Sequence, residues 1–439
     1  MIRMLLAASF AWLLLVAAPA QAFTIKQVTS PGGISAWLVE DHTVPLISMN
    51  FSFKGGAAQD PANTQGLANF LTTMLDEGAG DLPSREFQTR EQELAMRLSF
   101  NADADNFRGS FQTLSKNRDE AFAMLALALN KPRFDADPLE RMRAQLLQGL
   151  EMDAQDPEAI TSHAFMQQAL GDHPYARNSD GTLEGVKAVT ADDLRALHGR
   201  LFAREHLLIS AVGDIDEKTL GALLDKTFST LPEKSGMGDV PEMPSPKAAS
   251  LTIVDRDIPQ SIIQFGLPGI KRDDPDFIPA FVMNYVLGGG GFGSRLMEEV
   301  REKRGLSYSV WSDLYPLEQG GLIIGGAATR NEKAGETIDI IRQEIARLAA
   351  EGPTEQELAD VKTFLTGSYA LRFTSGRKTA AQLLGLQEQQ LGIDYVEKRN
   401  GLVNAVTLAD VKRVAERLLK DKPLLFTVTG RPVGVTASR

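Results

Sequence analysis

The chain has 439 residues, and its 57 acidic side chains outnumber its 46 basic ones, which gives a formal net charge of −11. An acidic chain without any basic run disfavours binding to nucleic acid or to anionic lipid. Because there is no cysteine, disulfides and a lipoprotein anchor on an N-terminal cysteine are excluded, and the core alone must stabilise the fold.

The first 22 residues are typical of a secretory signal peptide. Arg3 precedes an apolar run over residues 4–18, and Ala20-Gln21-Ala22 has the small-x-small order of a cleavage site. A membrane anchor is the alternative, but the run is short for a span and no basic stop-transfer cluster follows it. We therefore expect cleavage before Phe23 and export to the bacterial periplasm as 417 residues with a net charge of −12.

The first half of the mature chain, residues 23–231, places strands before helices. Alternating apolar residues predict strands at 34–39, 46–53 and 106–112, and amphipathic patterns predict helices at 116–129 and 138–152. Strands that precede a separate set of helices favour an α+β sandwich with a largely antiparallel sheet.

Residues 66–75 read Gly-Leu-Ala-Asn-Phe-Leu-Thr-Thr-Met-Leu, a segment that predicts a helix. It resembles the zinc helix of the insulinase-like (M16) metallopeptidases, Gly-Leu-Ala-His-Phe-Leu-Glu-His-Met-Leu. In this alignment Asn69 and Thr73 replace the two zinc histidines, and Thr72 replaces the glutamate general base. The third zinc ligand of the family, a glutamate on a later helix, aligns near Gly149, and Glu151 is the nearest acid.

These replacements remove the chemistry of the motif. Positions 69 and 73 lie one helical turn apart on one face, where two histidines could hold one zinc ion. An amide and a hydroxyl are weak, neutral ligands, and Thr72 has no basic form near neutral pH that could take a proton from water. The sequence therefore predicts a degenerate zinc site and no metal bound by this chain.

The chain repeats one fold twice, at nearly constant spacing. Val44-Pro45 returns as Ile258-Pro259 and Asp60-Pro61 as Asp274-Pro275, both 214 residues later. Residues 207–213 match residues 424–430 in the same way, 217 residues apart. Such a long period indicates domain duplication rather than a solenoid. We expect a proline-rich linker at 232–250 and a second domain at 251–439.

The second half contains the segment that resembles the M16 family most closely. Residues 287–296 read Leu-Gly-Gly-Gly-Gly-Phe-Gly-Ser-Arg-Leu, and residues 299–310 continue as Glu-Val-Arg-Glu-Lys-Arg-Gly-Leu-Ser-Tyr-Ser-Val. The glycine run lacks the Gly-Lys-Ser/Thr of a phosphate loop and follows a helix-like segment, so it is interpreted as a flexible loop.

A helix at 294–304 and a hairpin of strands at 306–314 and 322–328 are predicted to follow. Arg301 before the helix stop and Tyr308 in the following strand can then converge on one point. Their donors suit a peptide carbonyl that becomes an oxyanion. A core position for Tyr308 and a solvated surface position for Arg301 are the alternatives. In the family, an arginine and a tyrosine at these positions contact substrate beside the zinc.

The resemblance covers essentially the whole mature chain. It implies two homologous sandwich domains that face each other around a peptide-holding chamber. Short M16 members can divide the work between two chains, one with His-x-x-Glu-His and the other with the arginine and tyrosine.

The resulting hypothesis is a zinc-free subunit of a heterodimeric periplasmic zinc peptidase, with Arg301 and Tyr308 binding peptide at a zinc site in the partner. One alternative is a non-catalytic peptide-binding or scaffold protein with the M16 fold. Another is an M16 peptidase with an unusual metal site.

Overall fold

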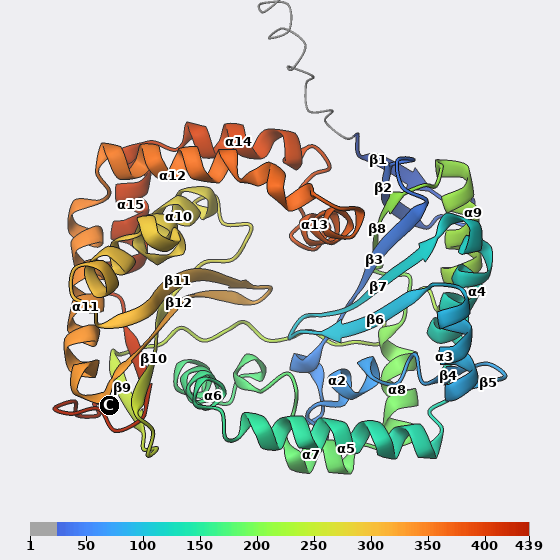
Figure 1. The fold of residues 1–439 in the computed structure, drawn as a ribbon, viewed down its shortest axis with the longest axis horizontal. Helices are drawn as coiled ribbons and strands as arrows, with labels where there is room; N and C mark the ends of the chain where they lie inside the picture. Colours follow the sequence, from blue (N-terminus) through green and yellow to red (C-terminus); the bar gives the residue numbers. More distant parts are fainter. Residues whose placement is uncertain (1–23, 439) are drawn as a thin grey trace, which may run out of the picture.

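The computed structural model describes residues 24–438, and the predicted signal segment at 1–22 lies outside this range. The architecture is α+β, as predicted, with two largely antiparallel sheets and helices packed on them. The N-terminal sheet and the C-terminal sheet lie on opposite sides of the molecule (Figure 1).

The first sheet has six strands in the order β1-β2-β8-β3-β7-β6. Its strands are β1 (Lys26–Thr29), β2 (Ser35–Glu40), β3 (Leu46–Lys54), β6 (Arg97–Ala102), β7 (Asn106–Leu114) and β8 (Leu208–Gly213). The pairing is antiparallel except between β2 and β8, which run parallel.

The second sheet has five strands in the order β11-β12-β10-β13-β9. Its strands are β9 (Ser250–Val254), β10 (Gln260–Pro268), β11 (Ser307–Leu317), β12 (Gly320–Arg330) and β13 (Leu425–Thr429). The hairpin of β11 and β12 is longer than predicted, because pairing continues to Leu317 and Gly320 and leaves two residues in the turn. Pro316 is tolerated within β11 because this strand lies at the sheet edge.

The two sheets share one topology, and the likeness extends to single residues. The order β2-β8-β3-β7-β6 in the first sheet corresponds strand by strand to the order β9-β13-β10-β12-β11 in the second. In each sheet the first two of these strands run parallel. Phe51 of β3 lies opposite Gly109 of β7, and Phe265 of β10 lies opposite Gly325 of β12. In both pairs the ring occupies the space of the missing glycine side chain, since a Cβ at position 109 or 325 would lie 2.0 or 2.2 Å from the ring.

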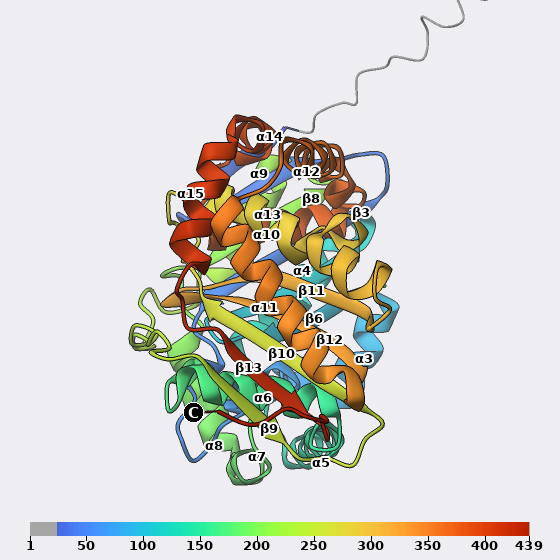
Figure 2. The same cartoon turned by 90° about the vertical axis from the view of Figure 1, so that its left-hand side faces the viewer.

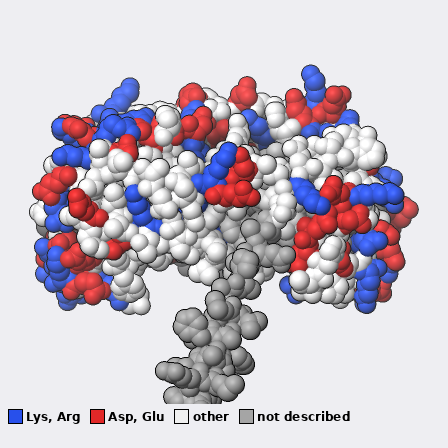
Figure 3. All heavy atoms as spheres, turned by 90° about the horizontal axis from the view of Figure 1, so that it is seen from above, with Lys and Arg blue, Asp and Glu red and all other residues white. Residues whose placement is uncertain are grey.

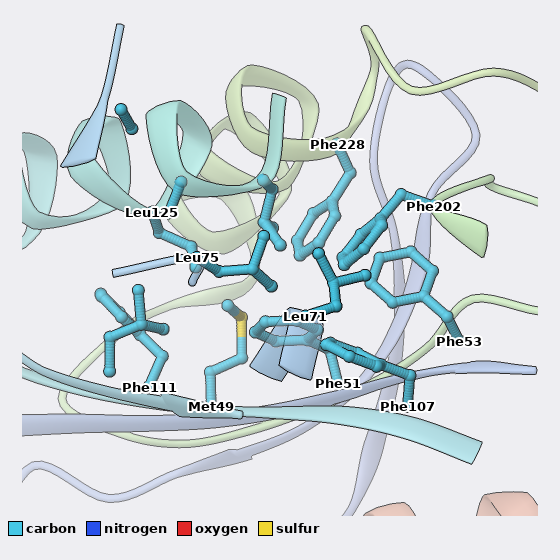
Figure 4. Packing of buried hydrophobic residues seen from close by; sticks show 14 of the residues in the cluster. Met49, Phe51, Phe53, Leu71, Leu75, Phe107, Phe111, Leu125, Phe202 and Phe228 are labelled. Carbon is cyan, nitrogen blue, oxygen red and sulfur yellow. The ribbon is translucent and has the colours of Figure 1, made fainter. Parts of the chain in front are cut away.

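The first half contributes the α-helices given below, and all of them except α6 cover the outer face of the first sheet and its ends. They are α2 (Leu67–Thr72), α3 (Ser84–Glu93), α4 (Arg118–Asn130), α5 (Ala136–Asp153), α6 (Pro157–Leu170), α7 (Leu183–Ala188), α8 (Ala191–Leu201) and α9 (Glu217–Phe228). Figure 4 shows how Leu125 and Phe228 from α4 and α9 meet Phe51 and Phe111 from the sheet. Phe51 meets Phe228 edge-on, and Phe111 meets Phe122 in the same way.

The α-helices of the second half, with the exception of α13, form a similar layer. They are α10 (Phe277–Asn284), α11 (Ala334–Glu351), α12 (Glu355–Gly367), α13 (Gly376–Glu388), α14 (Tyr395–Ala405) and α15 (Leu408–Leu419). Figure 2 looks onto α11 and α15, whose apolar faces pack with α10 on the outer face of the second sheet. Capping boxes begin α12 at Thr354 and α15 at Thr407.

The inner face of each sheet is covered by a helix from the other half. Helix α6 lies against β10 and β13, where Phe165 is fully buried and the hydroxyls of Thr161 and Thr429 share a hydrogen bond of 2.7 Å. Helix α13 lies against β3 and β8 in the same manner, with Leu383 fully buried (Figure 1). The halves are therefore joined by two buried helix–sheet contacts.

The predicted linker at 232–250 has no helix or strand before β9 begins at Ser250. It is nevertheless held against both halves. Val240 is buried beside α6, and the Met243 amide donates to the Gln319 carbonyl at 2.8 Å. Its path is fixed by these contacts.

Charges of both signs are mixed over the face shown in Figure 3. Within residues 24–438, no helix combines the length and the apolarity required to cross a bilayer.

Candidate functional site

The motif helix α2 is held by its buried apolar side chains and by an acid outside the helix. Leu67, Phe70 and Leu71 are buried in the first core. The Asp60 carboxylate accepts hydrogen bonds from the amides of Gly66 and Ala68 at 2.8 and 3.0 Å. Burial raises the pKa of Asp60 to about 7, although these amides at the helix start oppose the shift.

The helix is shorter than the predicted 66–75, because it ends at Thr72 and a turn continues from Thr73. The Thr72 hydroxyl donates to the carbonyl of Asn69 at 2.6 Å, and the Thr73 hydroxyl donates to the carbonyl of Phe70 at 2.9 Å. Two adjacent β-branched residues whose hydroxyls bond back to the backbone weaken a helix at this point.

The third ligand position offers nothing to a metal. Gly149 lies on α5 in open space and has no side chain, and Glu151 is exposed. Across residues 24–438, no group of three or more His, Cys, Asp or Glu side chains is placed to hold a metal ion. The residues at positions 69, 72, 73 and 149 therefore do not fit zinc, whose sites require imidazole, thiolate or carboxylate ligands.

The glycine segment of the second half, residues 288–293, begins within one π-helical turn, Tyr285–Gly289, and is followed by another, Met297–Glu302. The predicted helix at 294–304 is thus largely replaced by a wider turn, in which the Lys303 amide bonds to the Glu298 carbonyl. Such insertions are frequent at functional sites. Gly305 ends this segment with a positive φ of 59°, as expected of a helix stop.

A buried polar pair supports the first π-helical turn. Asn284 at the end of α10 donates to the Ser312 carbonyl at 3.1 Å and accepts from the Ser312 hydroxyl at 2.8 Å. Gly288 packs directly on Ser312, since a Cβ at position 288 would lie 2.6 Å from its amide nitrogen. The start of the glycine segment is therefore fixed to β11.

Arg301 and Tyr308 come together, and a third residue joins them. The guanidinium carbon of Arg301 lies 4.8 Å from the ring centre of Tyr308 and 4.4 Å from that of Phe292. Phe292 belongs to the glycine segment and was not singled out by the sequence, although an aromatic residue among glycines is an available signal.

Aromatic rings beside a guanidinium interact with its charge and leave its N–H donors able to hydrogen-bond to another group. The one ion pair of Arg301 is a contact of 3.7 Å with the neighbouring Glu302, and within residues 24–438 nothing accepts a hydrogen bond from it. The nearby Lys303 and Arg304 are instead both paired with the buried Glu299. Arg301 is therefore the cation of this segment that can donate to a ligand.

Tyr308 is not a core aromatic, because its side chain is 84% exposed. The pairing of β11 with β12 shifts register between Ser307 and Val310, and Tyr308 lies in this bulge. A bulge turns a side chain away from the face that strict alternation predicts. The arginine and tyrosine thus lie together at the surface of the second half, whereas the degenerate motif lies in the first half.

Profiles of one protein family match both halves of this chain. Residues 36–182 match the profile described as insulinase (peptidase family M16), and residues 188–365 match the profile described as peptidase M16 inactive domain.

This chain is similar both to a protein described as a non-peptidase homolog and to proteins described as zinc proteases. The non-peptidase homolog YmxG of Helicobacter pylori is 28% identical over 334 residues, which cover 76% of this chain and 77% of that protein. An uncharacterized zinc protease of Mycobacterium tuberculosis is 26% identical over 410 residues, which cover 91% of this chain and 92% of that protein.

A crystal structure of a peptidase M16 inactive domain from Pseudomonas fluorescens is similar with a TM-score of 0.88 at 29% identity, over 95% of this chain and 100% of that one. A protease from Helicobacter pylori, with a TM-score of 0.84 at 18% identity over 93% of this chain and 100% of that one, shares the fold. Together with the residues at the motif positions, these likenesses support a non-catalytic protein with this fold.

Proposed function

The chain belongs to the M16 peptidase family, and from this we propose that it is the zinc-free subunit of a heterodimeric periplasmic M16 peptidase. The partner would be an M16 subunit with an intact His-x-x-Glu-His motif. Arg301 and Tyr308 would bind the peptide at the partner's zinc site and stabilise the transition state. The periplasmic address rests on the sequence of residues 1–22.

One contrast carries this proposal. The motif positions of the first half hold side chains that cannot bind zinc, while the second half presents an arginine with an available donor edge beside an exposed tyrosine. A chain that keeps the second feature without the first can contribute to peptide hydrolysis only beside another subunit.

Arg301 and Tyr308 would stabilise the transition state electrostatically. The Arg301 guanidinium and the Tyr308 hydroxyl can both donate hydrogen bonds to a peptide carbonyl oxygen as negative charge develops on it. Donors of this kind are worth about 10²–10³ in rate. Metal, water and general base would come from the partner.

The test is a peptidase assay with the partner subunit. Arg301→Ala and Tyr308→Phe are each expected to reduce turnover about 10²-fold or more, while the assembled dimer persists in size-exclusion chromatography. Lys303→Ala is the control, because it removes a cation two residues away whose partners are Glu298 and Glu299. Unchanged turnover in both variants would show that the pair takes no part.

A second candidate function is a peptide-binding or scaffold protein without any peptidase partner. The likeness to a non-peptidase homolog favours it. In that case the purified chain binds peptides but never stimulates a zinc-bearing M16 subunit. An active peptidase with an unusual metal site requires proteolysis by the isolated chain and about one zinc ion in each chain.

A further inference from the structure

The proposed function gives a role to Arg301 and Tyr308 but none to Phe292. The ring centre of Phe292 lies 4.4 Å from the guanidinium carbon of Arg301, which is closer than the ring centre of Tyr308 at 4.8 Å. Phe292 is 68% exposed. Burial in a core therefore does not explain where this ring lies, and its contact with Arg301 requires an account of its own.

Phe292 is flanked by glycines, yet hydrogen bonds fix the backbone that carries it. The buried Ser294 closes a turn, because its amide and its hydroxyl both donate to the Gly291 carbonyl, at 3.0 and 2.7 Å. The Gly290 amide donates to the Tyr285 carbonyl at 3.0 Å and ties the segment to the first π-helical turn. Gly291 has a φ of 57°, which glycine adopts without strain. The ring is thus presented from a defined turn.

The guanidinium of Arg301 has few other contacts that fix its orientation. Its ion pair with Glu302 is long, at 3.7 Å, and no residue of 24–438 accepts a hydrogen bond from it. Among its polar and aromatic contacts, the two rings are the ones that restrict it. Ordering a long side chain costs rotamer entropy, and donors that are already aimed avoid this cost during a reaction. Loss of one ring should therefore loosen the guanidinium.

A phenylalanine ring suits the task of holding a cation whose donors must stay available. The side chain of Phe292 has no donor or acceptor, so it cannot stabilise an oxyanion directly. Its ring attracts the guanidinium electrostatically and takes up none of the N–H groups. A carboxylate in the same place would also hold Arg301, but it would accept hydrogen bonds from the donors that a peptide carbonyl needs. Any effect of Phe292 on this chemistry is therefore expected to act through Arg301.

We propose that Phe292 is a positioning residue that holds the Arg301 guanidinium beside Tyr308, with its donors ready for the peptide carbonyl. This role rests on the proposed function, which gives Arg301 its task. Phe292→Ala keeps the donor and removes one of its supports, so the loss is expected to be smaller than in Arg301→Ala. A cation–π contact at an exposed site corresponds to about two- to fivefold in rate.

Nuclear magnetic resonance of the isolated chain measures the positioning without a partner subunit. In protein labelled with ¹⁵N-arginine, the Nε–Hε signal of Arg301 is assigned by its loss in Arg301→Lys. We expect the order parameter of this group to fall in Phe292→Ala. Phe292→Trp keeps an aromatic ring and should preserve the order, whereas Phe292→Leu has comparable bulk without a π system and should not. Circular dichroism melting confirms that each variant is folded.

Kinetics of the assembly with a zinc-bearing M16 subunit then test the consequence for turnover, with an internally quenched fluorogenic peptide as the substrate. Phe292→Ala is expected to lower kcat about two- to fivefold and to leave KM unchanged, because the donor acts on the transition state. Phe292→Trp should restore kcat. In the Arg301→Ala background, Phe292→Ala should cause no further loss, since a residue that acts only through Arg301 has nothing left to position.

The outcomes separate the positioning role from the proposed function. An unchanged order parameter of Arg301 in folded Phe292→Ala overturns the positioning role. A loss of kcat that persists undiminished in the Arg301→Ala background also overturns it, and so does a raised KM at constant kcat, which would mean that the ring contacts the peptide itself. If Phe292→Ala loosens Arg301 while Arg301→Ala leaves turnover unchanged, the ring positions the guanidinium as inferred and the proposed function is refuted.

Discussion

Replacing Phe165 by alanine tests how firmly α6 joins the two halves. The ring of Phe165 is fully buried between the halves, and it fills the space above Gly266, where a Cβ would lie 2.6 Å from its Cζ atom. Since Gly266 cannot fill the vacated space, Phe165→Ala leaves a cavity. Truncation of a buried phenylalanine costs about 3–5 kcal/mol of unfolding free energy.

Urea unfolding followed by far-ultraviolet circular dichroism measures this cost. His163→Ala is the matched control on the same helix, where an exposed side chain is expected to contribute less than about 0.5 kcal/mol. Polar contacts of α6, such as the bond between Thr161 and Thr429, are unchanged in both variants. A cost below about 1 kcal/mol for Phe165→Ala would show that this helix does not hold the halves together.

Three further predictions follow from single contacts. The raised pKa of Asp60 means that the folded chain favours its protonated form, so its contribution to stability is complete below about pH 4 and is lost as pH rises through about 7. Asp60→Asn should flatten this part of a melting-temperature profile, and an unchanged slope would contradict the assignment. Glu388→Gln weakens the two hydrogen bonds that Arg108 donates to this side chain at 2.6 and 3.0 Å. In a denaturant titration it should lower the free energy of unfolding by about 1–3 kcal/mol, and a change near zero would contradict this prediction. Added zinc or EDTA should leave the melting temperature of the isolated chain unchanged, whereas a rise of several degrees with equimolar zinc would reveal a site that Asn69 and Thr73 do not explain.

Much of the fold could be predicted from sequence because it rests on local patterns. Alternation located β3 and β7 to within two residues, and helix periodicity located α4 and α5 similarly. The repeats 214 residues apart fall at corresponding strands, since β3 begins at Leu46 and β10 begins at Gln260.

The elements that sequence misjudged depend on tertiary contacts or on local backbone competition. The helix over the degenerate motif ends early because Thr72 and Thr73 bond back to the backbone. Alternation could not decide whether Tyr308 faces the core or the surface, since the bulge that exposes it depends on pairing with β12. Nor could it identify Phe292 as the second ring on Arg301, because that contact spans a glycine segment without periodicity.

The crossed placement of α6 and α13 has a consequence for how this chain is made. The inner face of the first sheet stays uncovered until residues 376–388 have been synthesised, although the main core of that half is built entirely from residues 28–231. The first half can therefore assemble its main core before the second half exists, but the cluster of Val39 and Val212 with Leu383 forms only when α13 arrives.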